Sequence, residues 1–402
     1  MRVTIFIIFL VPTLTLAAYK MKEVYEWKFV DFLWPSKYER IEAIQNGTYN
    51  RKRIIPMDVD KDRDGRVFVT LLGATGVPAT LGIVTNKTGP WGHLIKPYPN
   101  WSWFRPNDCN SIQSVHRIAI DKCNRLWILD VGFKMCCCTV CPPKLVVFDL
   151  DSDVHLKTVI IPDSITKYKR RSSIFVTPVV DTKGPQCEKT TVYIADTHSN
   201  TLIIYDGQSM RSLNHNTFNF DHNAQILTSG VNKVKAKNGI LGLAISPQVY
   251  PTDPKFLYYR PLSSKGLFAA NINELERSFH GENVNYFGDK ELLPSQAVAM
   301  AFSSNGTLFF GLTKESSIGC YNQYKKLVRG NIGIVDQDNE RLGYLNGVKV
   351  IKSSKKHPIE ELWVLSNHFV ASLSQSFMQN DKVKFRVLKG SVENLVKGTV
   401  CG

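Results

Sequence analysis

The chain has 402 residues, of which 43% are hydrophobic and 11% aromatic, and this composition excludes an intrinsically disordered chain. It carries 50 Lys and Arg against 35 Asp and Glu, a formal net charge of +15 at pH 7. A protein this basic is attracted to anionic surfaces such as extracellular matrix, eggshell, cuticle or membrane, or to nucleic acid.

The N-terminal segment, residues 1–18, has the features of a secretory signal peptide. Arg2 provides a positive charge, Val3–Leu16 form an apolar run, and Ala17 and Ala18 are small residues suited to cleavage. The apolar run is shorter than the roughly 20 residues that a membrane span requires, and no later segment is long and apolar enough. We therefore expect a secreted, extracellular protein with no membrane span and no nucleic-acid partner.

Four N-glycosylation sequons agree with secretion. Each lies in or beside a predicted turn, where a glycan is tolerated. The acceptor residues are Asn46, Asn86, Asn100 and Asn305.

A repeated pair of strands dominates the rest of the chain. Six times a short apolar strand ends at a polar turn residue, and a second, stronger strand follows. The turn residues are Asp60, Asp121, Asp181, Ser246, Ser303 and Ser353, and the stronger strands span Arg66–Thr70, Arg125–Asp130, Thr191–Asp196, Lys255–Tyr259, Thr307–Leu312 and Glu361–Ser366. Because no such unit can bury its own apolar face, the repeat predicts a radial array. We expect an all-β fold, a single six-bladed β-propeller over residues 19–402.

Nine cysteines in an oxidising compartment should mostly be paired. Cys123 and Cys187 follow the turn residues of neighbouring units, so we expect a disulfide between them. Cys320 follows the fifth stronger strand, and Cys401 is the penultimate residue. A bond between these two would fasten the C-terminus to the ring.

The other five cysteines allow more than one interpretation. They are Cys109, Cys136, Cys137, Cys138 and Cys141. The spacing of Cys138 and Cys141 suits half of a zinc site, but the sequence contains no second half. Disulfides within this loop, one of them reaching Cys109, are the favoured interpretation, and the odd total leaves at least one thiol free or intermolecular.

No other pattern in the sequence indicates a catalytic, metal or cofactor site. The acidic turn Asp60–Gly65 resembles the first half of a calcium loop, but Leu71 stands where a bidentate glutamate is required. No nucleophile elbow, zinc-protease motif or phosphate-binding loop is present. His368 directly follows the last stronger strand, at a loop face where binding groups tend to collect.

Several segments together resemble the Yellow / major royal jelly protein family of insects. The matching segments are Trp27–Phe32, Gly76–Leu81, His116–Gly132, Tyr258–Ser264, Met300–Leu312, Ile318–Asn322, Asn331–Ile334, Leu362–Asn367 and Gly398–Cys401. The resemblance implies a secreted six-bladed propeller and the same two disulfides, Cys123–Cys187 and Cys320–Cys401. The triplet Cys136–Cys138 departs from the family pattern.

The resemblance also implies a ligand site. In amine-binding members of the family, an Asn and a Phe after the last stronger strand hold the ligand in the channel, and Asn367 and Phe369 correspond to them. With His368 between them, an amide, an imidazole and a phenyl ring can orient a small aromatic ligand. Those members also use a Thr hydroxyl, and Val348 stands in its place, so we expect serotonin and dopamine to bind weakly or not at all.

Three functions are compatible with the resemblance. The favoured one is a non-catalytic secreted protein of cuticle, eggshell or melanin-pathway biology such as pigmentation, binding a small catechol- or indole-like molecule without a cofactor. The alternatives are a dopachrome-converting isomerase of melanin synthesis and a secreted biogenic amine-binding protein. An isomerase must move a proton off carbon with a positioned base, and His368 is the only base that the sequence nominates.

Overall fold

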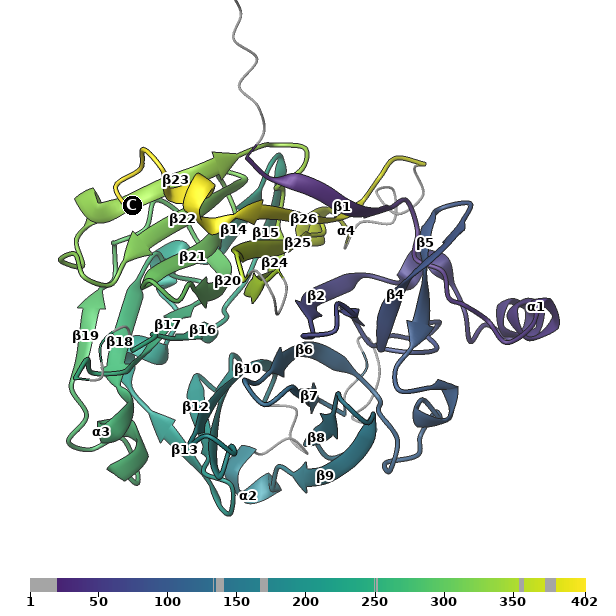
Figure 1. The fold of residues 1–402 in the computed structure, drawn as a ribbon, viewed down its shortest axis with the longest axis horizontal. Coiled ribbons are helices and arrows are strands. Elements are labelled where there is room, and N and C mark those ends of the chain that lie inside the picture. Colours follow the sequence, from purple (N-terminus) through teal and green to yellow (C-terminus); the bar gives the residue numbers. More distant parts are fainter. Residues whose placement is uncertain are drawn as a thin grey trace, which may run out of the picture.

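The computed structural model describes residues 20–132, 134, 141–166, 173–248, 250, 252–353, 358–372 and 381–402. The predicted signal peptide, the Cys136–Cys138 triplet and the basic run Lys167–Arg171 lie outside these residues. The described part is predominantly β-structure, and its sheets surround a common axis, as blades do in a β-propeller (Figure 1). None of its helices is long and apolar enough to cross a membrane.

Four of the sheets are four-stranded antiparallel meanders, each with its strands in chain order. Their strands are β6 (Val115–Ile120), β7 (Arg125–Asp130), β8 (Lys144–Asp149), β9 (Val154–Ile160); β10 (Phe175–Lys183), β11 (Lys189–Asp196), β12 (Thr201–Tyr205), β13 (Met210–Asn214); β16 (Ile240–Ile245), β17 (Phe256–Pro261), β18 (Leu267–Asn271), β19 (Tyr286–Asp289); and β20 (Ala297–Phe302), β21 (Thr307–Leu312), β22 (Ser317–Asn322), β23 (Ile332–Gln337).

A larger sheet of eight strands contains the first and the last strand of the described chain. Its order is β2-β3-β4-β5-β1-β26-β25-β24. The strands are β1 (Lys22–Trp27), β2 (Pro56–Lys61), β3 (Val67–Leu71), β4 (Leu81–Gly89), β5 (Gly92–Pro97), β24 (Leu345–Lys352), β25 (Glu360–Ser366) and β26 (Phe385–Ser391). Strand β1 pairs along its length with β26 and meets β5 only at Trp27 and Gly92. The N-terminal strand therefore links the first meander to the last one.

The remaining elements are short. A hairpin consists of β14 (Ile226–Ser229) and β15 (Asn232–Lys235), and the α-helices are α1 (Lys37–Gln45), α2 (Asp163–Thr166), α3 (Ile272–Arg277), α4 (Phe369–Ser372) and α6 (Val392–Val396). Single 3₁₀ turns are η1 (Arg51–Arg53), η2 (Trp101–Trp103), η4 (Asn216–Phe218), η5 (His222–Ala224) and η6 (Arg329–Asn331).

The second strand of each meander is the one with a continuous apolar sequence. All residues of β3 and β21 are buried, whereas the outer strand β9 is mostly exposed. A strand that has side chains packed on both of its faces reads as an unbroken apolar run instead of an alternating one. This packing explains why the second strand of each repeat is the stronger one in the sequence.

The polar turn residues mostly serve one local purpose. The side chains of Asp121 and Ser303 accept backbone N–H bonds that close the turns between β6 and β7 and between β20 and β21. Two of the predicted turn residues lie elsewhere, because Asp60 is inside β2 and Asp181 is inside β10. In the first meander Asp62 accepts the turn hydrogen bonds instead, since the first two strands extend beyond Asp60 before the chain reverses.

The first strands of the meanders form the inner wall. Strands β2, β6, β10, β16, β20 and β24 contact one another in that order, and β24 contacts β2 again. Their mutual contact closes a ring around a central channel, and Figure 1 shows the sheets extending outward from it. Whatever lies in this channel is therefore lined by residues from all parts of the chain.

Three disulfides join described cysteines. Cys123 bonds to Cys187 and Cys320 bonds to Cys401, the two pairs that the sequence predicts. Cys141 is joined to Cys109, so its thiolate is not available to the zinc half-site considered above. Among the described residues, no cluster of three or more His, Cys, Asp or Glu is placed to hold a metal ion.

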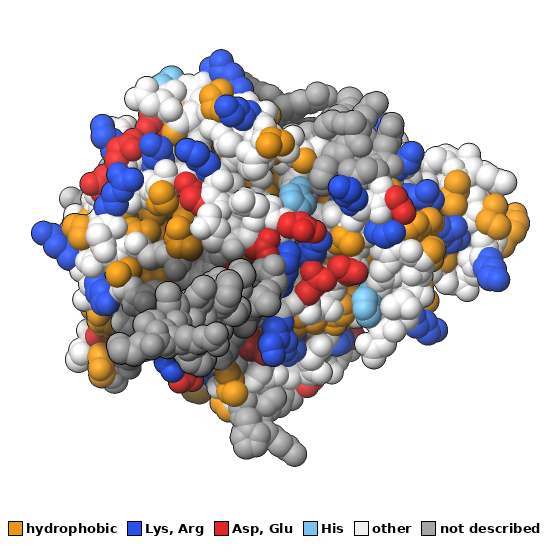
Figure 2. Space-filling model, turned by 90° about the horizontal axis from the view of Figure 1, so that it is seen from above, with side chains coloured by type: hydrophobic (Ala, Val, Ile, Leu, Met, Phe, Trp, Pro, Cys, Tyr) orange, Lys and Arg blue, Asp and Glu red, His pale blue; other side chains and the backbone are white. Residues whose placement is uncertain are grey.

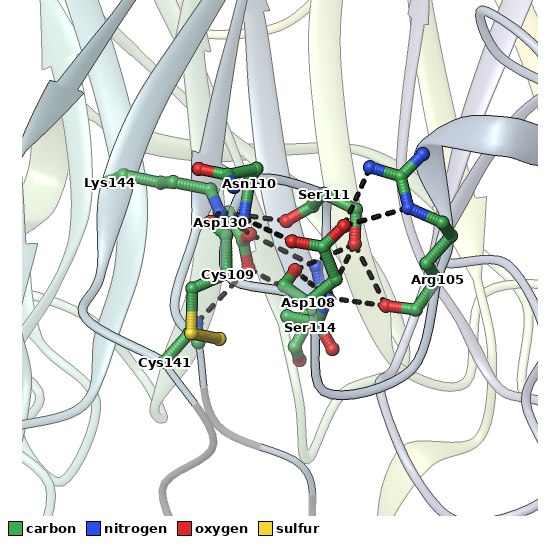
Figure 3. Close-up of a disulfide and its surroundings, with 11 residues drawn as sticks. Arg105, Asp108, Cys109, Asn110, Ser111, Ser114, Asp130, Cys141 and Lys144 are labelled. Carbon is green, nitrogen blue, oxygen red and sulfur yellow. Dashed lines mark hydrogen bonds and ion pairs between the residues drawn. A yellow bond between two sulfur atoms is a disulfide. The ribbon is translucent and has the colours of Figure 1, made fainter.

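The Cys109–Cys141 bond lies beside a buried ion pair (Figure 3). Lys144 Nζ donates to the carbonyl oxygens of Cys109 and Ser111 and lies 3.4 Å from Asp130 Oδ2. The Asp130 carboxylate also accepts three backbone N–H bonds. All of these partners come from the loop before β6 and the adjacent ends of β7 and β8, so the cluster anchors this loop.

Candidate functional site

The central channel contains two cavities with different chemistry. The six inner strands pass through it in the same direction, so their first residues surround one end and their last residues the other. The apolar cavity, about 310 Å³, is lined by Met57, Leu72, His116, Ile174, Val176, Thr197, Asn238, Leu241, Leu262, Val298, Tyr344, Asn346 and Phe369. The polar cavity, about 230 Å³, is lined by Asp58, Asp60, Arg117, Ala119, Ile120, Thr177, Pro178, Val179, Val180, Leu243, Ala244, Ile245, Ala299, Met300, Ala301, Phe302, Val348, Lys349 and Val350.

The side chain of Asn367, the first residue of the predicted ligand site, makes hydrogen bonds to backbone groups of the protein. Its side chain is fully buried. Its Nδ2 donates to Pro56 O at 2.7 Å, and its Oδ1 accepts from Phe369 N at 3.1 Å. Asn367 is not among the described residues that line the apolar cavity. Its amide instead ties the end of β25 to β2 and positions the residues that follow.

The other two members of the predicted site point in different directions. His368 has a positive φ of 43°, and its Nε2 lies 3.1 Å from Glu340 O. Burial and the nearby Arg386 guanidinium lower the pKa of His368. Phe369 does line the apolar cavity, where its ring lies 5.6 Å from that of Tyr344. Of the predicted tripeptide Asn367–Phe369, only Phe369 therefore lines one of the two channel cavities.

The residue that β24 contributes to the apolar cavity is Asn346. Val348, which the family resemblance places where amine-binding members have a Thr, lines the polar cavity instead. Asn346 Oδ1 accepts from Arg117 Nη2 at 3.1 Å. The missing hydroxyl at Val348 therefore has no bearing on the cavity that contains Phe369.

His116 lines the apolar cavity, although no motif in the sequence indicates a functional histidine at this position. Its Nδ1 lies 3.0 Å from the carbonyl oxygen of Phe175, which can only accept, so Nδ1 carries the proton. Burial lowers the pKa of His116 to about 4. At neutral pH the ring is thus uncharged, and its Nε2 is a hydrogen-bond acceptor. The only sequence signal was its position at the start of an inner strand.

Two buried arginines act on the apolar cavity from its surroundings. Arg260 is fully buried, and its hydrogen bonds go to the carbonyl oxygens of Ser264 and Gly266. Burial lowers the pKa of Arg260 to about 9, so it stays charged at neutral pH. The charges of Arg117 and Arg260 both act on the phenol of Tyr344, which lines the apolar cavity. A cationic ligand beside Tyr344 would be repelled by both.

The polar cavity holds acidic groups around a lysine. Lys349 Nζ lies 3.3 Å from Asp58 Oδ2 and 3.5 Å from Asp60 Oδ2, and donates to Ile118 O. Burial raises the pKa of Asp60 to about 6, although Lys349 opposes the rise. Burial alone would lower the pKa of Lys349, but the Asp58 and Asp60 carboxylates raise it above its ordinary value. The lysine is therefore a structural counterion and not a neutral amine nucleophile.

The hairpin β14–β15 and helix α4 cover the apolar cavity. Leu227 and Val234 of the hairpin and Val370 of the helix pack with residues that line it. Ser229 Oγ donates to Gly343 O at 3.0 Å, which joins the hairpin tip to the segment before β24. The cavity is thus bounded by elements outside the meanders.

The fold and the two cavities define a class, that of an all-β protein with ligand-sized space at each end of a central channel. Among solved structures, an alpha-L-arabinanase of Penicillium chrysogenum has a TM-score of 0.49 to this chain, at 10% identity, covering 92% of this chain and 99% of that one. A similarity at this level says nothing about function.

Sequence relatives are much closer. The family described as major royal jelly protein matches residues 113–401. The chain is 38% identical over 392 residues to major royal jelly protein 2 of Apis mellifera, covering 94% of this chain and 84% of that one. It is 37% identical over 389 residues to major royal jelly protein 9 of the same organism, covering 94% and 89%. The chain belongs to the major royal jelly protein family, as its sequence motifs indicate.

Proposed function

We propose that this protein is a secreted, non-catalytic member of its family that binds a small, uncharged aromatic molecule of the catechol or indole type in the apolar cavity. The observation that carries the proposal is the lining of that cavity. Phe369 and Tyr344 provide aromatic surface, and His116 and Asn346 provide a few polar groups among aliphatic side chains. Concave, mainly apolar sites with a few placed polar groups are typical of small-molecule binding.

We further propose that the chain is one domain with six blades. The eight-stranded sheet divides into two four-stranded meanders, β2–β5 and β24–β26 with β1, and strand pairing between these two meanders is limited to Trp27 of β1 and Gly92 of β5 among the described residues. Together with the four separate meanders, this division assigns one blade to each inner strand.

Secretion is supported by several features. Disulfides persist in oxidising compartments, and Asn46, Asn86, Asn100 and Asn305 are all exposed, as glycosylation requires. The net charge of +15 favours anionic partners in matrix, cuticle or eggshell. On the face shown in Figure 2, Lys and Arg side chains are interspersed with acidic ones, so this attraction is diffuse.

Calorimetry with catechol, indole and dopamine tests the binding proposal. We expect catechol or indole to bind, and Phe369→Ala to weaken that binding about tenfold through loss of aromatic contact. Dopamine should bind more weakly than catechol because its ammonium group meets the field of Arg117 and Arg260. The control is Phe279→Ala, a Phe that is 68% exposed. Tight dopamine binding, or equal effects of the two Phe variants, contradicts the proposal.

An isomerase is the second candidate, and His116 is the observation that favours it. A neutral imidazole whose Nε2 has no hydrogen-bond partner among the described residues has the form of a general base. Its pKa of about 4 makes it a weak one, which is why we favour binding without catalysis. A dopachrome-decay assay separates the two: accelerated decay that is lost in His116→Gln would establish the enzyme.

A further inference from the structure

The polar cavity contains two buried polar atoms that no described group satisfies. Asp58 Oδ1 and Arg117 Nε have no hydrogen-bond partner in the parts of the chain that the structure describes. The two residues are 1% and 3% exposed, and both line the polar cavity. Buried polar atoms in folded proteins are nearly always paired, so an unpaired donor and an unpaired acceptor on one cavity wall call for an external partner.

These two side chains are neighbours. Burial lowers the pKa of Arg117, while the charge of Asp58 raises it. Asp58 Oδ2 also accepts from the backbone N–H of Ile118, the residue next to Arg117, at 3.2 Å, so the carboxylate lies beside Arg117 on the cavity wall.

The other polar groups of this wall are already occupied. Lys349 Nζ has three acceptors, which are Ile118 O and the Oδ2 atoms of Asp58 and Asp60. Arg117 Nη1 donates to Thr177 Oγ1 at 2.7 Å, and Nη2 donates to Asn346 Oδ1. Asp58 Oδ1 and Arg117 Nε are therefore the acceptor atom and the donor atom of this wall that have no described partner. With two acids and two bases present, the wall also has no net charge when all four are ionised.

We propose that the polar cavity is a second binding site, separate from the apolar cavity, for a small neutral compound that carries a hydroxyl group. A hydroxyl oxygen can donate to Asp58 Oδ1 and accept from Arg117 Nε–H at once. An ammonium group offers no acceptor, and a carboxylate offers no donor. The cavity is otherwise lined by apolar side chains, including Val179, Met300 and Phe302. These suit the hydrocarbon or aromatic body of an alcohol or phenol.

Methionine methyl NMR can test this site independently of the apolar one. Met300 lines the polar cavity, and Met57 lines the apolar cavity. The full chain, with its disulfides intact and its methionine methyls labelled with ¹³C, is titrated with phenol, toluene, benzylamine and benzoate. Resonances are assigned with Met300→Leu and Met57→Leu. We expect phenol to shift the Met300 resonance saturably, and the other three probes to need at least about tenfold higher concentration because each leaves Asp58 or Arg117 unpaired.

A matched pair of variants tests the recognition group. Asp58→Asn should weaken phenol binding at Met300 at least about fivefold, because a charge-assisted hydrogen bond becomes a neutral one. Asp62→Asn is the control, since Asp62 is also buried in the first meander but does not line the cavity. Unchanged resonances of the other methionines show that a variant is folded.

Several results would overturn the proposal. They are a Met300 resonance that phenol does not move, toluene or benzylamine acting as strongly as phenol, or equal effects of Asp58→Asn and Asp62→Asn. The probe series on the unaltered protein decides the matter even if the variants do not fold. Because Met57 reports the apolar cavity separately, failure of the catechol or indole proposal leaves this result unaffected.

Discussion

At the scale of single residues, side chains near the channel have one of two roles. Some make hydrogen bonds that stabilise the fold, and others line a cavity. Asn367 uses its whole amide to tie β25 to β2 and to the backbone of Phe369. Phe369, Tyr344 and His116 then form part of the apolar cavity wall. The amide therefore influences the apolar cavity only through the position of Phe369.

A substitution at Asn367 should accordingly affect stability. Asn367→Ala leaves Pro56 O and Phe369 N unpaired in a buried place, and we expect it to lower the free energy of unfolding by about 2 kcal/mol. Denaturant unfolding measures this loss. The control is Asn273→Ala on the exposed surface of α3, which should change the free energy of unfolding by less than about 0.5 kcal/mol. A fully stable Asn367→Ala protein would show that the amide is dispensable.

Asp60 should make stability depend on pH. Its pKa is 3.8 in an ordinary setting and about 6 in the folded protein, where burial disfavours the carboxylate. The folded state therefore holds the proton more tightly than the unfolded state, and this stabilising contribution is complete below pH 3.8 and lost as pH rises through 6. Relative to wild type, Asp60→Asn should gain about 2 kcal/mol of stability between pH 4 and pH 7. Parallel pH series of denaturant unfolding for the two proteins measure the gain, and a constant difference would contradict the shift.

At the scale of elements, β1 is the strand that joins the two ends of the chain. Trp27 at its end is 1% exposed, pairs with β5 and β26, and donates through Nε1 to His93 O at 2.7 Å. The helix α1 that follows projects from the ring (Figure 1) and exposes Tyr38 and Ile41. Neighbouring segments of the chain thus differ greatly in how much they contribute to the core.

Removal of the Trp27 side chain should destabilise the place where β1 meets β5 and β26. Trp27→Ala creates a large cavity and removes a buried hydrogen bond, so we expect a loss of about 4 kcal/mol in the free energy of unfolding. Tyr38→Ala, at a residue that is 74% exposed, is the comparison and should have little effect. Thermal and denaturant unfolding of the two variants provide the measurement. If both were equally stable, β1 would not be holding the ring closed.

At the scale of the whole molecule, disulfides reinforce a ring that is closed by strand pairing. Cys123–Cys187 links two adjacent meanders, and Cys320–Cys401 ties the C-terminus back to β22, 81 residues earlier. Cys109–Cys141 closes a shorter loop of 32 residues. By loop-closure entropy, the longest loop should contribute most to stability.

The disulfide variants test this order. Cys320→Ala with Cys401→Ala should cost about 4 to 5 kcal/mol of unfolding free energy, and Cys109→Ala with Cys141→Ala about 1 kcal/mol less. Equilibrium unfolding without reductant measures both. A loss of less than about 1 kcal/mol for the long loop would mean that strand pairing alone closes the ring.

The sequence by itself indicated the first two strands of each repeat unit, the family and two disulfides. These features depend on local patterns. A strand that is covered on both faces has an unbroken apolar sequence, and for this reason the bounds of β7 and β21 could be predicted. The pair Cys123–Cys187 could be expected because its cysteines occupy related places in the repeat, and the pair Cys320–Cys401 because it fastens the C-terminus to the ring.

Only the tertiary structure decided which side chains face the channel and at what depth. Residues two apart on a strand share a face but lie about 6.6 Å apart along it. That spacing separates Asn346 in the apolar cavity from Val348 in the polar one, a difference that no strand pattern contains. His116 became a cavity residue for the same reason, because the channel wall is assembled from inner strands far apart in the chain, and each contributes only a few residues at any depth.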